Sequence, residues 1–221
     1  MKLLPILSII KFLMQKRTLI FDFDGTIADT HLFIIDIYNS FSDDFGYKRI
    51  DVRKLERYKD KNAQQIIRHL KIPIFKIPSL ITKAKMLYHQ DIHKIKPFDG
   101  LKEVLEKLKA AGHTLGILSS NSRPNIMKFL DNHHLQVFDF IQSTSSVLGK
   151  NSAIKKLAER MNINLNDILY IGDEVRDIEA AKKLGIKVAA VTWGYNSLRA
   201  LKARKPDFLI HHPKELLLLC R

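Results

Sequence analysis

Short apolar runs alternate along the chain with longer segments in which apolar residues recur every three or four positions. The short runs are typical of buried strands and the longer segments of amphipathic helices. The expected strands lie in TLIFDFDG, HTLGILSSN, FDFIQST, DILYIGDE and IKVAAVTWG, which begin at residues 18, 113, 138, 167 and 186. The expected helices cover residues 101–111, 124–133, 152–161, 177–184 and 197–203. This alternation predicts an α/β fold, a Rossmann-like parallel sheet with helices on both faces.

Residues 31–96 depart from this alternation, because they carry a helical pattern and no convincing strand. We therefore expect an α/β core made of residues 17–30 and 97–221, with a small all-helical unit inserted after the first strand. The insert holds 14 Lys and Arg against 7 Asp and Glu, so it carries half of the net charge of +14.

The first sixteen residues, MKLLPILSIIKFLMQK, form an N-terminal extension ahead of the first strand. The apolar stretch is broken by Pro5 and Ser8 and lacks a cleavage site of small residues, so we do not interpret it as a signal peptide. It is also shorter than the roughly 20 apolar residues of a membrane span. We expect it to pack on the body or lie on its surface, and MQKRTLIFDFDG makes Met14 a candidate native start.

Composition narrows the class of protein. With 46% hydrophobic and 27% charged residues, the chain has the composition of a folded protein. A sequence pI near 9.8 favours anionic partners, which include phosphorylated metabolites and nucleic acids. Cys220 is the one cysteine, so an intramolecular disulfide is impossible and a reducing cytoplasm is the expected compartment.

Acidic and polar side chains follow the expected strands at the edge where an open parallel sheet binds ligands. Several carboxylates in one small volume repel one another, at about 4 kcal/mol per pair 4 Å apart at an effective dielectric constant of 20. Oxygen ligands without His or Cys favour Mg²⁺ as the compensating cation. Neutral hydrogen-bond donors and a lysine could bind an anion next to this cation. The candidate residues are Asp22, Asp24, Asp173, Glu174 and Asp177 among the acids, and Ser119, Ser120, Asn121 and Lys150 among the donors.

These residues resemble four ordered motifs of the haloacid dehalogenase superfamily. The motifs are Asp22-Phe23-Asp24-Gly25-Thr26, the hydroxyl of Ser120, Lys150, and Gly172-Asp173-Glu174-Val175-Arg176-Asp177. The resemblance covers nearly everything from Arg17 onward. The insert is similar to the alpha-helical, C1-type cap of the subfamily that includes phosphoglycolate phosphatases and β-phosphoglucomutases. Signature stretches of phosphoglycolate phosphatase-like members resemble Pro97-Phe98-Asp99-Gly100, Ser120-Asn121 and Trp193-Gly194-Tyr195-Asn196.

The resemblance implies a division of labour between the first two acids. Asp22 would attack phosphorus and become an aspartyl phosphate, while Asp24 would protonate the leaving oxygen and then activate water. Mg²⁺ would be held by Asp22, Asp173 and the backbone carbonyl of Asp24.

The remaining motif residues would bind phosphate or support the site. Ser120 and Lys150 would hold phosphoryl oxygens, with Asn121 as a further donor. Asp177 would orient Lys150 or the water ligands of the metal. Glu174 departs from the small polar residue of many relatives and adds a carboxylate beside the metal.

The insert carries a weaker signal, because cations on helices are usually solvated. Arg57 and Lys61, and with them Lys59 and Arg68, could meet a second anionic group of the substrate. Of these four, Arg57 and Lys61 are the expected substrate contacts of the insert.

We therefore expect a cytoplasmic, Mg²⁺-dependent phosphatase for a small phosphorylated metabolite, with 2-phosphoglycolate as the leading suggestion. A sugar-phosphate mutase would share the whole core, whereas a dehalogenase would not need Asp24. A nucleic-acid-binding protein and a catalytically silent regulator are the alternatives from other classes. We expect no nucleic-acid partner, since no recognised motif is present, no membrane partner, and a monomer or a homodimer.

Overall fold

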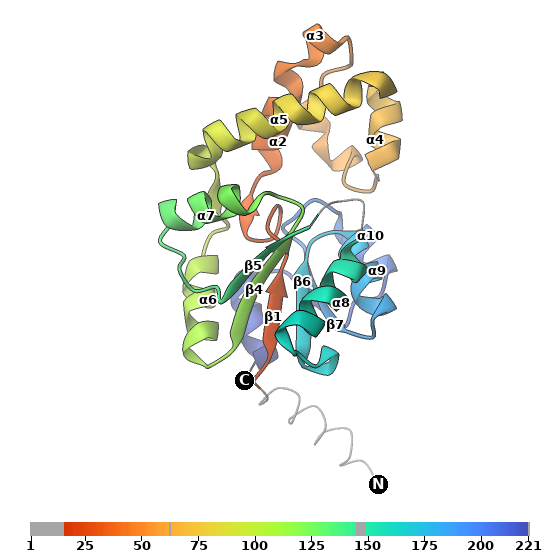
Figure 1. Cartoon of the computed structure of the whole chain (residues 1–221). Helices are drawn as coiled ribbons and strands as arrows, with labels where there is room; N and C mark the ends of the chain where they lie inside the picture. The colour runs from red at the N-terminus through yellow and green to blue at the C-terminus, as the bar shows by residue number, and fades with distance from the viewer. Residues whose placement is uncertain (1–15, 62, 145–148, 221) are drawn as a thin grey trace.

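The computed structural model describes residues 16–61, 63–144 and 149–220. The expectations for the N-terminal extension and for Met14 as a start lie outside these residues. Figure 1 shows two stacked parts, an α/β core and a helical cap above it. In the described part of the chain, no helix has both the length and the apolar character that crossing a membrane requires.

The core is built on a six-stranded sheet in which all pairings are parallel. The strand order is β5 (Phe140–Ser143), β4 (Thr114–Ser119), β1 (Thr18–Phe21), β6 (Ile168–Gly172), β7 (Lys187–Val191) and β8 (Phe208–Ile210). The predicted Rossmann-like α/β fold is confirmed. The edge strand β8 was not predicted, because three residues are too few for a recognisable pattern.

Alternate residues of the strands pack into two separate apolar layers, since successive side chains of a strand point to opposite faces. Leu19 and Phe21 of β1 belong to one layer, and Ile20 belongs to the other. The first layer is covered by α6 (Leu101–Ala110), α7 (Arg123–Asn132) and η6 (Pro213–Cys220). The second is covered by α8 (Lys150–Met161), α9 (Val175–Lys183) and α10 (Leu198–Ala203). Helices α8 and α9 begin two residues earlier than the sequence pattern predicted.

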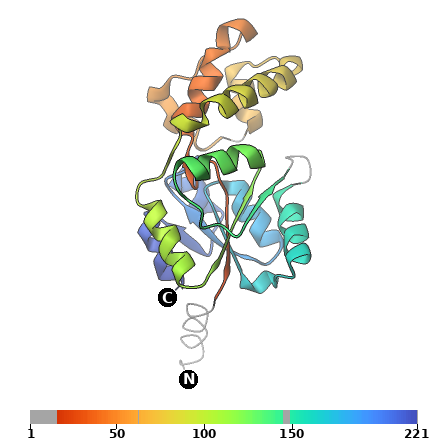
Figure 2. The same cartoon turned by 60° about the vertical axis from the view of Figure 1, so that its left-hand side comes forward.

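The cap is inserted between two short strands that pair with each other. These are β2 (Ala28–Asp29) and β3 (Lys96–Pro97), which form an antiparallel ribbon. Figures 1 and 2 both show the cap over the end of the sheet toward which β1 runs. The elements between β2 and β3 are α2 (His31–Ser40), α3 (Ser42–Phe45), η1 (Val52–Arg57), α4 (Ala63–Leu70), η2 (Ile74–Lys76), α5 (Ile77–Asp91) and η3 (Ile92–Lys94).

The cap has a small apolar centre of its own and is hydrogen-bonded to the core. Phe45 and Leu80 are among the buried residues of that centre. The backbone carbonyl of Lys59 accepts hydrogen bonds from Asn196 Nδ2 (2.8 Å) and from Ser197 N (3.2 Å). Asp60 accepts hydrogen bonds from the side chains of Ser197 and Arg199. The cap therefore rests against the core.

Candidate active site

The site lies where three neighbouring strands end. Strand β1 lies between β4 and β6, so the residues that follow these strands share one edge of the sheet. Asp22 follows β1, Ser120 follows β4 and Asp173 follows β6. The structure therefore brings together the strand ends that the sequence analysis singled out.

Three buried carboxylates form a compact cluster at this edge. Oxygen atoms of Asp22, Asp173 and Asp177 all lie within 4.8 Å of one another. Burial raises the pKa of Asp173 well above its ordinary value, and the charges of Glu174, Asp177 and Asp22 raise it further. A cluster of this kind is costly to keep ionised without a cation.

Lys150 supplies part of the compensating charge. Its Nζ donates to Asp22 Oδ2 (2.7 Å) and to a carboxylate oxygen of Asp177. Burial by itself would lower the pKa of Lys150, but the charges of Asp177 and Asp22 hold it well above its ordinary value. Lys150 is the first residue of α8, where a cation opposes the helix dipole, and these two carboxylates account for its position there.

The residues around the acidic cluster fit a magnesium ion. The donors are carboxylate oxygens only, which is the chemistry that Mg²⁺ prefers. Asp173 is oriented by Thr26 Oγ1 (2.7 Å) and by the backbone N–H of Tyr195 (2.7 Å). The backbone of Gly194 approaches so closely that a Cβ atom there would lie 2.1 Å from Cβ of Asp173. These contacts hold Asp173 in one orientation, as a metal ligand requires.

Asp24 faces away from the cluster and toward the cap. Its Oδ1 accepts a hydrogen bond from the hydroxyl of Tyr88 (2.6 Å) on α5, and its Oδ2 accepts one from Asn121 Nδ2 (3.1 Å). Burial raises the pKa of Asp24 to about 6, and the charge of Asp22 adds to the rise. The hydrogen bonds from Tyr88 and Asn121 act in the opposite direction. Asp24 is therefore poised to exchange a proton near neutral pH.

The two serines at the end of β4 differ in their surroundings: Ser119 is the last residue of the strand and Ser120 follows it. Ser119 is buried, and its Oγ accepts a hydrogen bond from the backbone N–H of Asn121 (3.0 Å). Ser120 is exposed and lines the cavity beside Asp24. The amide of Asn121 binds Asp24 rather than pointing freely into the cavity. This arrangement favours Ser120 over Ser119 as the phosphate donor.

The side chain of Glu174 forms its hydrogen bonds outside the acidic cluster. It caps α9 in a reciprocal arrangement with Asp177, whose Oδ2 accepts from the backbone N–H of Glu174 (3.0 Å). Its Oε1 accepts a hydrogen bond from the guanidinium of Arg176 (2.5 Å). Burial raises the pKa of Glu174 to about 6, while the charge of Arg176 opposes the rise. Its carboxylate thus supports the helix that carries Asp177.

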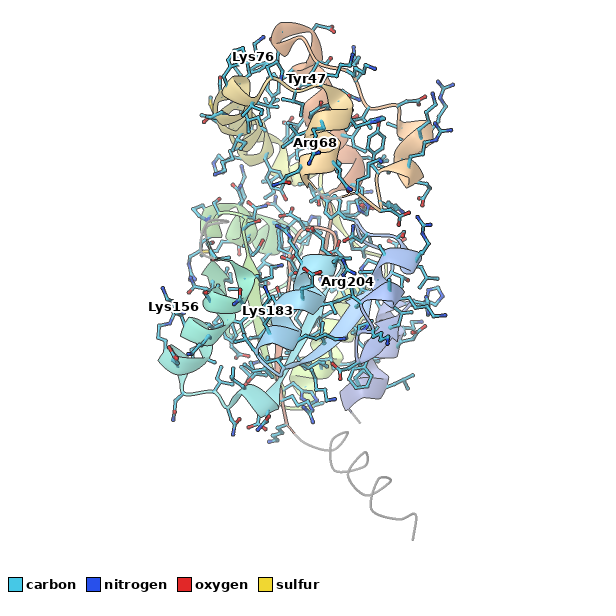
Figure 3. The ribbon with its side chains drawn as sticks, turned by 90° about the vertical axis from the view of Figure 1, so that its right-hand side faces the viewer. Tyr47, Arg68, Lys76, Lys156, Lys183 and Arg204 are labelled. Atoms are coloured by element: carbon cyan, nitrogen blue, oxygen red, sulfur yellow. The ribbon has the colours of Figure 1, made fainter. Side chains whose placement is uncertain are left out.

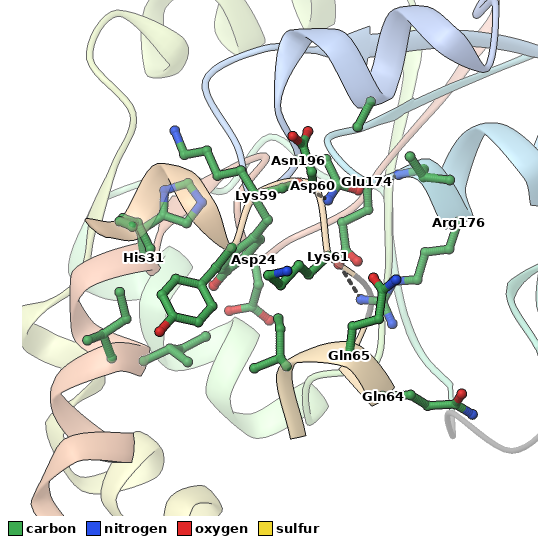
Figure 4. Close-up of a pocket in the computed structure, with 18 of the residues that line it drawn as sticks. Asp24, His31, Lys59, Asp60, Lys61, Gln64, Gln65, Glu174, Arg176 and Asn196 are labelled. Carbon is green, nitrogen blue, oxygen red and sulfur yellow. Dashed lines mark hydrogen bonds and ion pairs between the residues drawn. The ribbon is translucent and has the colours of Figure 1, made fainter. Parts of the chain in front are cut away.

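A cavity of about 1090 Å³ separates the cap from the strand ends (Figure 4). Lys59 and Lys61 line it from the cap, and Arg176 and Arg204 from the core. Of the described residues that line this cavity, none is Arg57 or Arg68. Figure 3 shows Arg68 on the cap, where its side chain is exposed. Lys61 is therefore the better placed of the two cap candidates.

Sequence reasoning assigned no role to three residues that the structure places at the site. Tyr88 lies 64 positions from Asp24 along the chain, and the pattern of apolar residues in its helix does not indicate a contact with that acid. Thr26 belongs to the first motif and could have been singled out there. Asn196, in the stretch WGYN, binds both the cap carbonyl of Lys59 and the backbone N–H of Val175 (2.7 Å).

Fold and site together define a hydrolase of the haloacid dehalogenase type. The family model for haloacid dehalogenase-like hydrolases matches residues 19–191, and the chain belongs to this family. The sheet order, the helical cap after the first strand and the ordered motifs agree with that assignment.

Two relatives that match this chain over almost their full length carry the names of phosphatases. A phosphoglycolate phosphatase from Synechococcus elongatus is 34% identical over 91% of this chain and 95% of its own. A pyrophosphatase, PpaX, from Bacillus cereus is 28% identical over 92% of this chain and 96% of its own. Among solved structures, the haloacid dehalogenase-like hydrolase SP0104 from Streptococcus pneumoniae has a TM-score of 0.81. It is 21% identical, with 91% of this chain and 97% of that chain covered, and supports the fold.

Proposed function

We propose that the chain is a Mg²⁺-dependent phosphatase that hydrolyses a small phosphorylated metabolite through an aspartyl phosphate on Asp22. The observation that carries the proposal is the pair of carboxylates with different surroundings. Asp22 is bound to Lys150 within the acidic cluster, whereas Asp24 is raised to a pKa of about 6 and turned toward the cap. One acid is thereby suited to attack and the other to move a proton.

In the first step, a carboxylate oxygen of Asp22 attacks phosphorus and the ester P–O bond breaks. Asp24 gives its proton to the departing alcohol oxygen. In the second step, Asp24 takes a proton from water, whose oxygen attacks phosphorus, so that phosphate leaves and Asp22 is regenerated. Covalent catalysis replaces one difficult displacement by two easier ones.

The other residues hold charge in place. Lys150 and Ser120 bind phosphoryl oxygens, and Asp177 keeps Lys150 oriented through their ion pair. Asp22, Asp173 and the backbone carbonyl of Asp24 would hold Mg²⁺, which neutralises charge on the phosphoryl oxygens when bound. Asn121 and Tyr88 orient Asp24.

For the substrate, the phosphoglycolate phosphatase relative supports 2-phosphoglycolate as the first candidate. Lys61 would meet its carboxylate from the cap. A single cysteine supports a reducing, cytoplasmic setting.

The test is phosphate release from a panel that includes 2-phosphoglycolate, pyrophosphate and hexose phosphates, with Mg²⁺ or with chelator. An Asp22→Asn variant serves as the control. We expect Mg²⁺-dependent release that the variant lacks. Phosphoryl transfer between sugar positions without net release would instead identify a mutase, and equal release by the variant would refute the role of Asp22.

A further inference from the structure

We propose that the cavity beneath the cap contains a second region that binds a ring on the leaving group. The chain would then hydrolyse phosphate monoesters of primary alcohols that carry a nitrogen heterocycle, in addition to small esters such as 2-phosphoglycolate. This inference rests on the proposed phosphatase function and extends it to a class of substrate.

The cap already rests on the core, so an open cap does not account for the size of the cavity. Tyr88 binds Asp24 on one side, and Lys59 accepts hydrogen bonds from Asn196 and Ser197 on the other. The cavity measures about 1090 Å³ with these contacts formed. Sites for drug-sized ligands typically span about 300–1,000 Å³, whereas a phosphorylated two-carbon acid needs far less.

Part of the cap side of the cavity is an apolar wall. Ile34 of α2, Leu55 of η1, and the rings of Tyr38 and Tyr58 line it. Ile34 is 37% exposed, although Ile35 beside it is only 5% exposed. Binding of a flat ring against such an aliphatic and aromatic surface is favourable, because apolar area of both the ring and the wall is removed from water.

Amide groups line the same cavity and select the kind of ring. Gln64 and Gln65 of α4 are among the lining residues, and Figure 4 shows the amide of Gln65 on the side of the cavity where Arg176 lies. An amide both donates and accepts hydrogen bonds, so it suits the ring nitrogens and carbonyls of a heterocycle better than a hydrocarbon. The wall and the amides face the same cavity as Asp24 and Ser120, so one ligand can reach both regions.

Binding to the Asp22→Asn protein tests the inference without turnover. The probes are pyridoxine 5′-phosphate and uridine 5′-monophosphate, compared with 2-phosphoglycolate and glycerol 3-phosphate, by calorimetric titration with Mg²⁺ present. Each is a phosphate ester of a primary alcohol, and the first two carry a nitrogen heterocycle that the other two lack. We expect at least one ring ester to bind tenfold more tightly than glycerol 3-phosphate.

A double variant, Ile34→Gln with Leu55→Gln, makes the wall polar. Its matched control is Val52→Gln with Ile81→Gln, because Val52 shares η1 with Leu55 and both control residues are exposed at 44% and 48% outside the cavity lining. We expect the wall variant to lower the ratio of ring-ester to 2-phosphoglycolate kcat/KM at least fivefold. The control should keep the wild-type ratio.

The outcomes separate the inference from the function on which it rests. Ring esters that bind no better than glycerol 3-phosphate, or a wall variant that keeps the wild-type ratio, overturn the ring site and leave the phosphatase intact. If no ester is hydrolysed by the wild type, the phosphatase proposal fails, while the binding comparison still decides the ring site.

Discussion

Asp24 differs from Asp22 in its neighbours rather than in its chemistry. It lies two positions further along the chain, yet its carboxylate contacts a cap tyrosine and a strand-end amide instead of a lysine. The raised pKa of Asp24, about 6, is the basis of the next two predictions.

The Asp24→Asn variant should lose activity according to the leaving group. General acid catalysis contributes typically about 10²–10⁴-fold, and activated aryl phosphates need little of it. We expect single-turnover phosphoenzyme formation to fall by about two orders of magnitude or more with alkyl esters, and much less with an aryl ester. An equal loss with both esters would argue against an acid role for Asp24.

The two chemical steps should depend on pH in opposite directions. The pKa of Asp24 is about 6, so its acid form is lost as pH rises through 6 while its base form is gained. Phosphoenzyme formation from an alkyl ester should therefore slow above pH 6, and hydrolysis of the phosphoenzyme should accelerate. Stopped-flow measurement of both steps from pH 5 to 8 checks this, and parallel profiles would contradict it.

At the scale of elements, the loop that follows β7 connects the cap to the acidic cluster. Asn196 accepts from Val175 N at the start of α9 and donates to Lys59 O in the cap. The neighbouring Tyr195 N–H binds Asp173. Docking of the cap is thus mechanically linked to the segment that orients an acidic ligand.

Asn196→Ala should lower kcat/KM by more than its loss of folding free energy accounts for. Asn39→Ala is a matched control, because Asn39 also donates to one backbone carbonyl (Ile50 O, 2.9 Å) and accepts from a backbone N–H (Ile50 N, 2.7 Å), but wholly within the cap. Each variant should lose about 1–3 kcal/mol of folding free energy. Only Asn196→Ala should lower kcat/KM about tenfold or more. Similar kcat/KM losses in both variants would show that Asn196 acts through stability alone.

For the whole molecule, the buried acids lead us to expect that stability depends on a cation. Asp22 lies far along the chain from Asp173 and Asp177, so the repulsion between it and these two acids acts against the assembly of the fold. A ligand that binds only the folded state stabilises it by about 2.7 kcal/mol at a hundred times its Kd.

Mg²⁺ should therefore raise the melting temperature of the wild type, and chelator should reverse the rise. Asp173→Asn should abolish the Mg²⁺-dependent rise, because it removes a buried acid of the cluster. The control is Asp139→Asn, since Asp139, like Asp173, accepts hydrogen bonds from a side chain (Lys109) and from a backbone N–H (Leu115, 2.8 Å), but lies in no such cluster among the described residues. Thermal unfolding with and without Mg²⁺ decides, and a rise retained in Asp173→Asn would place the ion elsewhere.

The parallel sheet, the helical insert and the edge at which the acids meet could all be predicted from the sequence. Local patterns suffice for these, because the period of apolar residues marks strands and helices and the carboxyl ends of adjacent parallel strands share one edge. The resemblance added roles for Asp22, Asp24, Lys150 and Asp173, and these roles stay predictions.

The residues that surround those acids could not be predicted in this way, because they come from distant parts of the chain. Tyr88 reaches Asp24 from a distant helix, Asn196 joins the cap to α9, and Ile34 is left uncovered at the cavity. A helix pattern predicts which face is apolar but not which distant residue that face meets, since the packing of cap on core sets that contact. The surroundings that adjust proton affinity, and the volume left for the leaving group, follow from this packing and have no local signature in the chain.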